Sequence, residues 1–267
     1  MLSITTDYAR DTGDPEPYLR RIAVAGFTHV HWCHHWCTDF LYAAPEIRQI
    51  SRWLKELRLG VLDLHASAGQ EKNWASAREY ERQAGVALVR NRLEMTARLG
   101  GDVIILHVPG GAPDDVLRRS LAALETASAK CGVRVALENG DFAVNRRLLG
   151  EYGPEFLGLC YDSGHGNLCQ ADGLAQLETL RDRLLAVHLH DNDGASDQHK
   201  LPFTGTIDWP RLTRILARSA YRKCISLETI IKNTGLSDET LFLGQAREAG
   251  LKLTAMVEAH RAERSGP

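Results

Sequence analysis

The sequence lacks the features of several large classes of protein. It contains no apolar run approaching the roughly 20 residues of a membrane span, and Met1–Arg10 has no basic segment followed by an apolar core, so we expect no signal peptide. Its 32 basic and 34 acidic residues give a net charge of −2, without the basic excess that sequence-independent DNA binding needs. Its six cysteines lack the spacing of a disulfide framework. We therefore expect a protein of the reducing cytoplasm that binds neither a membrane nor a nucleic acid.

What the sequence does contain is a regular alternation of strand-like and helix-like segments. Short apolar runs predict buried strands, and amphipathic segments, such as the one with Ile47, Ile50 and Leu54, predict helices between them. No linker or change of composition divides the 267 residues, whose number fits the roughly 250 residues of an eightfold barrel. We predict an α/β fold, a single (β/α)8 TIM barrel over residues 1–267. The predicted strands are Leu2–Thr6, Phe27–Trp32, Val61–His65, Val103–His107, Val133–Glu138, Leu157–Asp162, Leu185–His190 and Lys223–Thr229.

Glycine, aspartate and proline mark the predicted helix ends. Gly60, Gly100 and Gly132 each fall where a helix should end before a strand, because glycine adopts the left-handed conformation of a helix C-terminus. Asp208 with Pro210 is typical of an N-cap followed by proline in the first turn. These signals agree with the predicted alternation of strands and helices.

Side chains that bind metals follow six of the apolar runs. They are His65, His107, Glu138, Asp162, His188 and Glu228. An ionisable residue at the end of a buried strand is costly unless something compensates its charge, and the strand ends of a barrel share one rim, where catalytic groups sit. A single carboxylate there could also cap a helix or pair with an arginine. Carboxylates with one imidazole suit Mn²⁺, Co²⁺, Mg²⁺ or Zn²⁺. The predicted ligands are Glu138, Asp162, His188 and Glu228.

These residues stand in motifs that resemble those of the xylose isomerase-like TIM-barrel superfamily. The motifs are Leu137-Glu138-Asn139, Asp162-Ser163-Gly164-His165, His188-Leu189-His190-Asp191-Asn192 and Leu227-Glu228-Thr229. The superfamily includes sugar isomerases, ketose epimerases, inosose-processing enzymes and endonuclease IV, and the resemblance covers nearly the whole chain. In the sugar enzymes the matching Glu, Asp, His and Glu hold one divalent metal. The resemblance implies that Glu138 and Glu228 also pass protons to and from a small sugar substrate.

The chemistry of such a reaction accounts for this set of residues. Isomerising or epimerising a ketose requires the removal of a proton from the carbon beside a carbonyl. A divalent ion stabilises the negative charge of the enediolate as a Lewis acid. One carboxylate removes the proton and a second returns it. Glu138 and Glu228, on the fifth and eighth strands, are placed to flank a flat intermediate. A barrel that merely senses sugars or serves as a scaffold would not need both glutamates.

Five further residues keep a second enzymatic interpretation open. They match metal-binding positions of endonuclease IV, in which nine side chains hold three zinc ions, and they are His65, His107, His165, Asp197 and His199. The resemblance therefore also allows a trinuclear zinc enzyme that cleaves abasic DNA. In sugar enzymes the same imidazoles would instead contact substrate hydroxyls.

The sugar interpretation is favoured by charge and by loop length. The rim loops carry no clustered lysine or arginine to follow phosphates, and the chain lacks the extra loops expected of a repair enzyme. One departure limits the substrate: ketose 3-epimerases have an arginine six residues beyond the metal histidine, where this chain has Gly194. Nothing in the motifs selects a particular sugar or an oligomeric state.

Several other residues near the predicted rim are candidates for the site. His190 and Asp191 follow His188 and are expected to orient the ligands from behind. A dense cluster surrounds the end of the second strand: His29, His31, Cys33, His34, His35 and Cys37. We expect His31 or His34 to line the pocket, since the pair Cys33 and Cys37 has no second half that would complete a structural zinc site. The aromatic rings of Trp32, Trp36 and Trp74 could stack on a sugar, although covering the barrel mouth is the simpler role.

Overall fold

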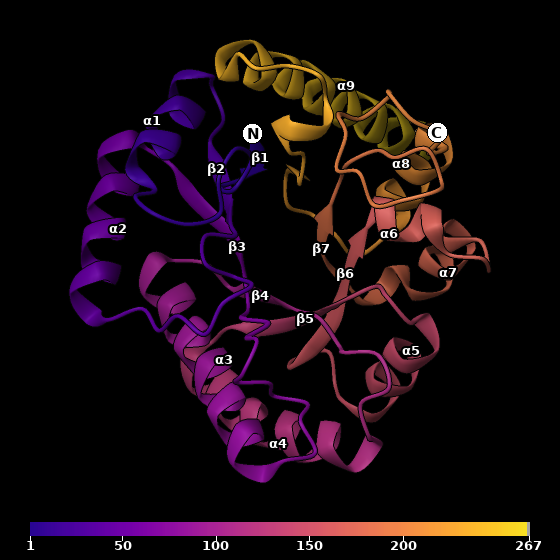
Figure 1. The fold of residues 1–267 in the computed structure, drawn as a ribbon. Helices are drawn as coiled ribbons and strands as arrows, with labels where there is room; N and C mark the ends of the chain where they lie inside the picture. Colours follow the sequence, from indigo (N-terminus) through magenta and orange to yellow (C-terminus); the bar gives the residue numbers. More distant parts are fainter. Residues whose placement is uncertain (266–267) are drawn as a thin grey trace.

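The computed structural model describes residues 1–265 and contains one barrel. Eight parallel strands pair in the order β7-β6-β5-β4-β3-β2-β1-β8, and helices surround them (Figure 1). The barrel closes between β7 and β8 through the parallel pair Leu189 and Leu227, where Leu189 N–H donates to Ser226 O at 3.0 Å and Glu228 N–H donates to Leu189 O at 3.2 Å. The predicted single TIM barrel is confirmed. None of the described helices is long and apolar enough to cross a bilayer.

The strands and helices alternate along the chain. The strands are β1 Leu2–Thr5, β2 His29–Trp32, β3 Gly60–His65, β4 Val103–Leu106, β5 Arg134–Glu138, β6 Leu157–Asp162, β7 Leu184–His188 and β8 Ile225–Leu227. The α-helices are α1 Glu16–Val24, α2 Ala44–Leu57, α3 Glu79–Leu99, α4 Asp114–Cys131, α5 Phe142–Glu151, α6 Ser163–Leu168, α7 Gly173–Leu180, α8 Trp209–Arg218 and α9 Glu239–Ser265. Two short 3₁₀ turns, Arg181–Arg183 and Ile231–Asn233, precede β7 and α9.

All eight predicted strands are present, but several of their ends were wrong. His107 and His190 lie just beyond β4 and β7, and β8 is shorter at both ends than the predicted Lys223–Thr229. The predicted residues beyond these bounds continue the apolar runs but lie outside the paired strands. Strand identity thus follows from the apolar runs, whereas strand ends depend on tertiary pairing.

The helix ends confirm the predictions at Gly100, Gly132 and Asp208, and contradict the one at Gly60. Gly100 and Gly132 have positive φ values of 82° and 67° at the ends of α3 and α4, and Asp208 accepts a hydrogen bond from Arg211 N as the N-cap of α8. Helix α2 instead ends at Arg58, with φ 55°. Gly60 begins β3 beside His29, where a Cβ atom would lie 2.7 Å from the imidazole ring. Glycine is used there for space between strands.

The barrel interior differs between its two halves. Beneath the rim, β4 to β7 contribute a small apolar cluster of Val103, Ile105, Ala136, Cys160 and Ala186. On β8, β1, β2 and β3 the corresponding interior positions are polar and fully buried: Ser226, Ser3, His31 and Asp63. Since side chains alternate across a strand, residues two positions further along point to the same interior and reach the carboxyl-end rim.

A close approach between helix α3 and the loop after β3 generates a stability prediction. A Cβ atom at Gly85 would lie 2.1 Å from Trp74 N and 2.4 Å from Asn73 C, so the helix packs directly on the loop backbone. We expect Gly85→Ala to lower the free energy of unfolding by about 1–3 kcal/mol, as overpacking does.

The matched control is Gly244→Ala in helix α9, where an added Cβ meets nothing within 4 Å. Alanine there should raise the free energy of unfolding by about 0.5–1 kcal/mol, because it lowers the entropy of the unfolded chain and favours the helix. Urea unfolding followed by circular dichroism measures both. Equal effects of the two substitutions would contradict the described packing of α3.

Candidate active site

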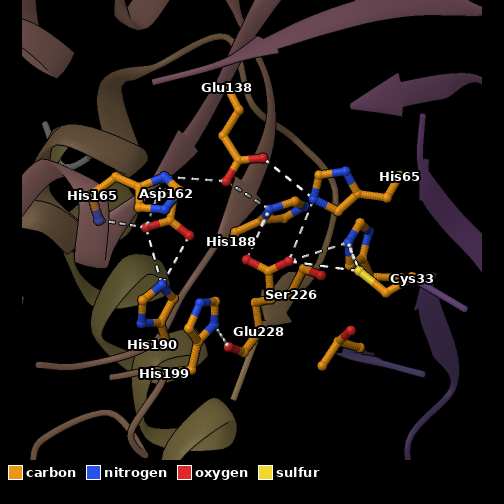
Figure 2. A network of polar contacts seen from close by, with 12 residues as sticks. Cys33, His65, Glu138, Asp162, His165, His188, His190, His199, Ser226 and Glu228 are labelled. Atoms are coloured by element: carbon orange, nitrogen blue, oxygen red, sulfur yellow. Dashed lines mark hydrogen bonds and ion pairs between the residues drawn. The ribbon is translucent and has the colours of Figure 1, made fainter. Parts of the chain in front are cut away.

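Four predicted ligands meet at one point of the carboxyl-end rim. Glu138, Asp162 and His188 are the last residues of β5, β6 and β7, and Glu228 directly follows β8. One ligand atom from each lies within 4.8 Å of the others, and all four side chains are buried (Figure 2). The strand register explains part of this convergence, because Asp162 is paired directly with His188 across β6 and β7. A rim built from parallel strands thus brings residues 138, 162, 188 and 228 together.

The charges of this cluster are not balanced by lysine or arginine. Within residues 1–265, the ion-pair partners of its three carboxylates are all histidines. His188 Nδ1 lies 3.4 Å from Glu138 Oε1 and 3.2 Å from Glu228 Oε2. Glu138 Oε2 and His188 Nε2 are buried without a hydrogen-bond partner. Three carboxylates and one imidazole, with no lysine or arginine to balance the charge, fit a divalent cation.

The pKa shifts of the cluster have the same electrostatic origin. Burial raises the pKa of Glu228, but the adjacent His188 and His31 outweigh burial and hold that pKa well below its usual value. Burial lowers the pKa of His188, yet Cys160 and the two glutamates raise it well above its usual value. Glu228 is therefore ionised and available to a cation. An ion that takes His188 as a ligand must displace the proton of that imidazole.

Asp162 is held in place by neighbours on three sides. His190 Nε2 lies 3.0 and 2.9 Å from its two carboxylate oxygens, and Asp162 Oδ1 accepts a hydrogen bond from His165 N at 2.7 Å. Its backbone exchanges two hydrogen bonds with the Asn139 side chain, at 2.6 and 2.9 Å. His190 thus contacts a predicted ligand from behind. A Cβ atom at Gly164 would lie 2.0 Å from His190 Cε1, so glycine leaves the room that this ring occupies.

Asp191 lies close to the cluster in sequence but faces another part of the molecule. Its carboxylate accepts hydrogen bonds from Trp209 Nε1 at 2.9 Å and from the N–H groups of Asn192 and Ile207 at 3.0 and 3.3 Å. Its backbone pairs in both directions with Lys200 at 2.9 Å. Asp191 therefore fixes the loop between β7 and α8, and no described hydrogen bond joins it to Glu138, Asp162 or Glu228.

The five additional candidates surround the cluster on two sides. On one side, the Nε2 atoms of His65 and His107 lie 3.5 and 3.2 Å from Glu138 Oε2. On the other, Asp197 Oδ2 lies 3.4 Å from His165 Nε2 and 3.0 Å from His199 Nε2. The structure therefore brings all five within reach of the central four.

Two imidazoles on the Asp197 side carry a positive charge at neutral pH. The nearby Asp162 carboxylate is the main cause that raises the pKa of His165 to about 11. Burial lowers the pKa of His199, but its hydrogen bond with Asp197 outweighs burial and raises that pKa to about 10. His165 lies beside Glu138 and Asp162, whereas His199 pairs with Asp197 outside the central four.

The histidine-rich segment after β2 divides between the site and the surface. His31 points into the barrel, where Nδ1 lies 2.6 Å from Asp63 Oδ1, and Cys33 Sγ lies 3.0 Å from His31 Nε2. His34 instead bonds Gly13 O through Nε2 at 2.9 Å. Of the two histidines expected to line the pocket, His31 lies beside the cluster, with Nε2 3.6 Å from Glu228 Oε1, and His34 does not. Asp63 was missed, although its position two residues before His65 on the same strand is a signal for an inward side chain.

Of the three candidate tryptophans, only Trp36 lies at the site. Trp32 and Trp74 are buried in the apolar core between barrel and helices. The Trp36 ring stacks on His65, with centroids 4.5 Å apart, and on His107, at 5.4 Å. Trp36 therefore lies across the β3 and β4 side of the mouth, beside a buried His65 and a partly exposed His107.

Comparisons with known proteins place this architecture among related chains. A protein of uncharacterised function from Sinorhizobium fredii, y4fM, is 34% identical, over 91% of this chain and 89% of its own. Among solved structures, a D-psicose 3-epimerase has a TM-score of 0.79 at 17% identity and covers 96% of this chain and 99% of its own. An L-ribulose 3-epimerase has a TM-score of 0.78 at 18% identity, with 99% and 96% covered.

The likeness to the two epimerases shows a shared fold, at a sequence identity too low to carry a substrate from one protein to the other. The match to a family model rests on the sequence itself. Residues 19–252 match the xylose isomerase-like TIM barrel family. That stretch runs from α1 into α9 and includes every residue of the central cluster. This chain belongs to the xylose isomerase-like TIM barrel family.

Proposed function

We propose that this protein is a divalent-metal-dependent isomerase or epimerase of a small sugar or sugar-derived ketone. The observation that carries the proposal is the convergence of Glu138 and Glu228 on either side of His188, buried and unpaired by lysine or arginine. Paired carboxylates at one cation site are what proton transfer beside a carbonyl requires. The names of the two epimerases of similar fold support the same class of substrate.

In this proposal Glu138, Asp162, His188 and Glu228 hold the divalent ion. Once bound, the ion supplies Lewis-acid stabilisation of the negative charge that develops on the substrate oxygens. Asp162 serves as a ligand rather than a base, since His190 Nε2 lies 3.0 and 2.9 Å from its two carboxylate oxygens and His165 N donates to one of them. The Asn139 and His190 contacts fix the direction of its oxygens.

The two glutamates transfer the proton. Glu228, held ionised, removes a proton from the carbon beside the carbonyl through one carboxylate oxygen. Glu138, across the cluster, returns a proton to the opposite face of the flat intermediate. His107 and His165 are partly exposed beside Glu138 and are placed to bond substrate hydroxyls.

A second candidate function rests on the five additional residues. Two of them, His65 and His107, lie on one side of the cluster, and the other three lie on the other side. Together with the four residues of the cluster they make nine potential ligands. That number allows an endonuclease IV-like phosphodiesterase with three zinc ions. The absence of lysine and arginine from the described ion pairs of the cluster disfavours a phosphate-rich substrate.

The first prediction concerns the metal ligands. We expect Mn²⁺ to stabilise the wild-type protein after treatment with a chelator, by about 2.7 kcal/mol at an ion concentration 100-fold above Kd. Asp162→Asn should lose most of this gain, because it removes a ligand charge while keeping the N-cap of α6. Asp141→Asn is the control, since Asp141 caps the neighbouring helix α5 and lies outside the cluster. Thermal unfolding with and without Mn²⁺ measures the difference. An equal gain in both variants would exclude Asp162 as a ligand.

The second prediction concerns proton transfer. Glu138→Gln and Glu228→Gln keep the shape of the side chain and remove the base, so each should lower turnover by on the order of 10²-fold or more. In D₂O, the wild-type protein should place deuterium on the carbon beside the carbonyl of a ketose substrate, and both variants should largely fail to do so. Glu151→Gln, at the exposed end of α5, is the control.

The same metal-loaded sample separates the two candidate functions. Deuterium exchange can be screened over a panel of ketoses without knowledge of the product. A duplex with an abasic site tests phosphodiester cleavage. Incision of that duplex, together with no exchange into any ketose of the panel, would favour the nuclease and refute the isomerase.

The third prediction concerns the room for His190. Gly164→Ala should push the His190 ring away from Asp162 and weaken Mn²⁺ binding by about 10–100-fold, the usual effect of losing a group that orients a metal ligand. Gly140→Ala, at the rim after β5, should have no such effect, because a Cβ atom there meets nothing within 4 Å. Titration calorimetry with Mn²⁺ compares the two. Wild-type affinity in Gly164→Ala would show that His190 does not position Asp162.

A further inference from the structure

A second group of metal-binding side chains lies beside the proposed catalytic site and shares only Glu228 with its four ligands. His31 Nε2, Cys33 Sγ, His65 Nε2 and Glu228 Oε1 all lie within 4.8 Å of one another, and all four residues are buried. Figure 2 shows Cys33 and His65 approaching Glu228 from the side opposite Asp162. We propose that these four side chains bind a second divalent ion, zinc or cobalt, next to the first.

The spacing of the four atoms fits tetrahedral coordination. Glu228 Oε1 lies 3.6 Å from both His31 Nε2 and His65 Nε2 and 3.7 Å from Cys33 Sγ. Cys33 Sγ lies 3.0 Å from His31 Nε2. With metal–sulfur bonds of about 2.3 Å and metal–nitrogen bonds of about 2.0 Å, tetrahedral ligands lie about 3.3–3.6 Å apart. Adjustments of a few tenths of an ångström therefore complete the site.

The orientation of His31 is fixed from behind by a buried carboxylate. Its Nδ1 lies 2.6 Å from Asp63 Oδ1, and both side chains are 0% exposed. This bond leaves Nε2 directed at Cys33 and Glu228. A carboxylate behind an imidazole is the arrangement that orients metal-bound histidines and raises their basicity. Asp63 Oδ2 is buried without a hydrogen-bond partner. Among the described residues, His31 is thus the one hydrogen-bond partner of the Asp63 carboxylate.

The chemistry of the donors separates the two sites. The first site offers three carboxylates and one imidazole, which suit hard ions such as Mn²⁺ and Mg²⁺. The second includes a thiol, whose sulfur as thiolate favours zinc or cobalt. Glu228 joins them, since its Oε2 faces His188 at 3.2 Å and its Oε1 faces His31 and His65. Each ion would use one oxygen of Glu228, so both can be held at once. Glu228 can then take no proton from a substrate, so the proposed proton transfer requires the second site to be empty.

The test is a cobalt titration of the protein freed of metal, under anaerobic and reducing conditions. Cobalt bound to a thiolate gives a strong charge-transfer band in the near ultraviolet. We expect this band in the wild-type protein and its loss in Cys33→Ala, together with one fewer cobalt ion per chain. The controls are Cys37→Ala, an exposed cysteine of the same segment, and Cys160→Ala, a buried cysteine near His188, which should both keep the band.

Two results would overturn the proposal: a charge-transfer band that persists in Cys33→Ala, or the same number of cobalt ions in Cys33→Ala and the wild type. Should Cys33→Ala fail to fold, judged by circular dichroism, Cys33→Ser reports on the same band with a side chain of similar size. Asp63→Asn should weaken the ion that gives the band by about 10–100-fold and leave Mn²⁺ binding unchanged.

The test does not depend on the reaction. A protein that shows the band but exchanges no proton with any ketose keeps the second site and loses the proposed function. A protein that exchanges protons in the wild type and in Cys33→Ala alike, without the band, keeps the function and loses the second site.

Discussion

The burial of three carboxylates in one barrel mouth is the constraint on which the site depends. Glu138, Asp162 and Glu228 are all buried. Negative charges at such short distances repel one another strongly where water cannot screen them. Histidines supply the compensation in the described structure, and in the proposed function a divalent cation would supply more of it. The surrounding imidazoles, the orienting asparagine and the glycine under His190 are each intelligible as parts that hold these acids in place.

The two halves of the barrel serve this constraint differently. Below Glu138, Asp162 and His188 the interior is closed by small apolar side chains, which keep water away from the base of the cluster. Below Glu228 the interior is polar, with His31 and Asp63 bonded to each other. The apolar half strengthens electrostatic interactions at the rim, and the polar half extends the network of donors deeper into the barrel. Glu228 stands at the boundary between them.

The fold and the central cluster could be predicted from the sequence because both follow from one-dimensional patterns. Apolar runs separated by amphipathic helices predict the eight strands, and a polar residue at the end of each run predicts the rim. What the sequence could not predict depends on pairing across the barrel. Gly60 begins β3 and leaves room for the His29 ring, which its place after a predicted helix does not reveal. Asp191 turns to Trp209, and Asp63 gains meaning only when β2 and β3 bring it against His31.

The seam between β7 and β8 has a mechanical consequence. Two described backbone hydrogen bonds cross it at the rim, and one of them uses the N–H of Glu228 itself. Glu228 therefore both presents its carboxylate to the cluster and helps to close the barrel through its backbone. Local opening of this seam would carry Glu228 away from His188. A ligand of the Glu228 carboxylate that binds only the closed barrel also stabilises the pairing of β7 with β8, because its binding disfavours opening. Ligand binding at the barrel mouth and opening of the β7–β8 seam are thus linked, so that each shifts the equilibrium of the other.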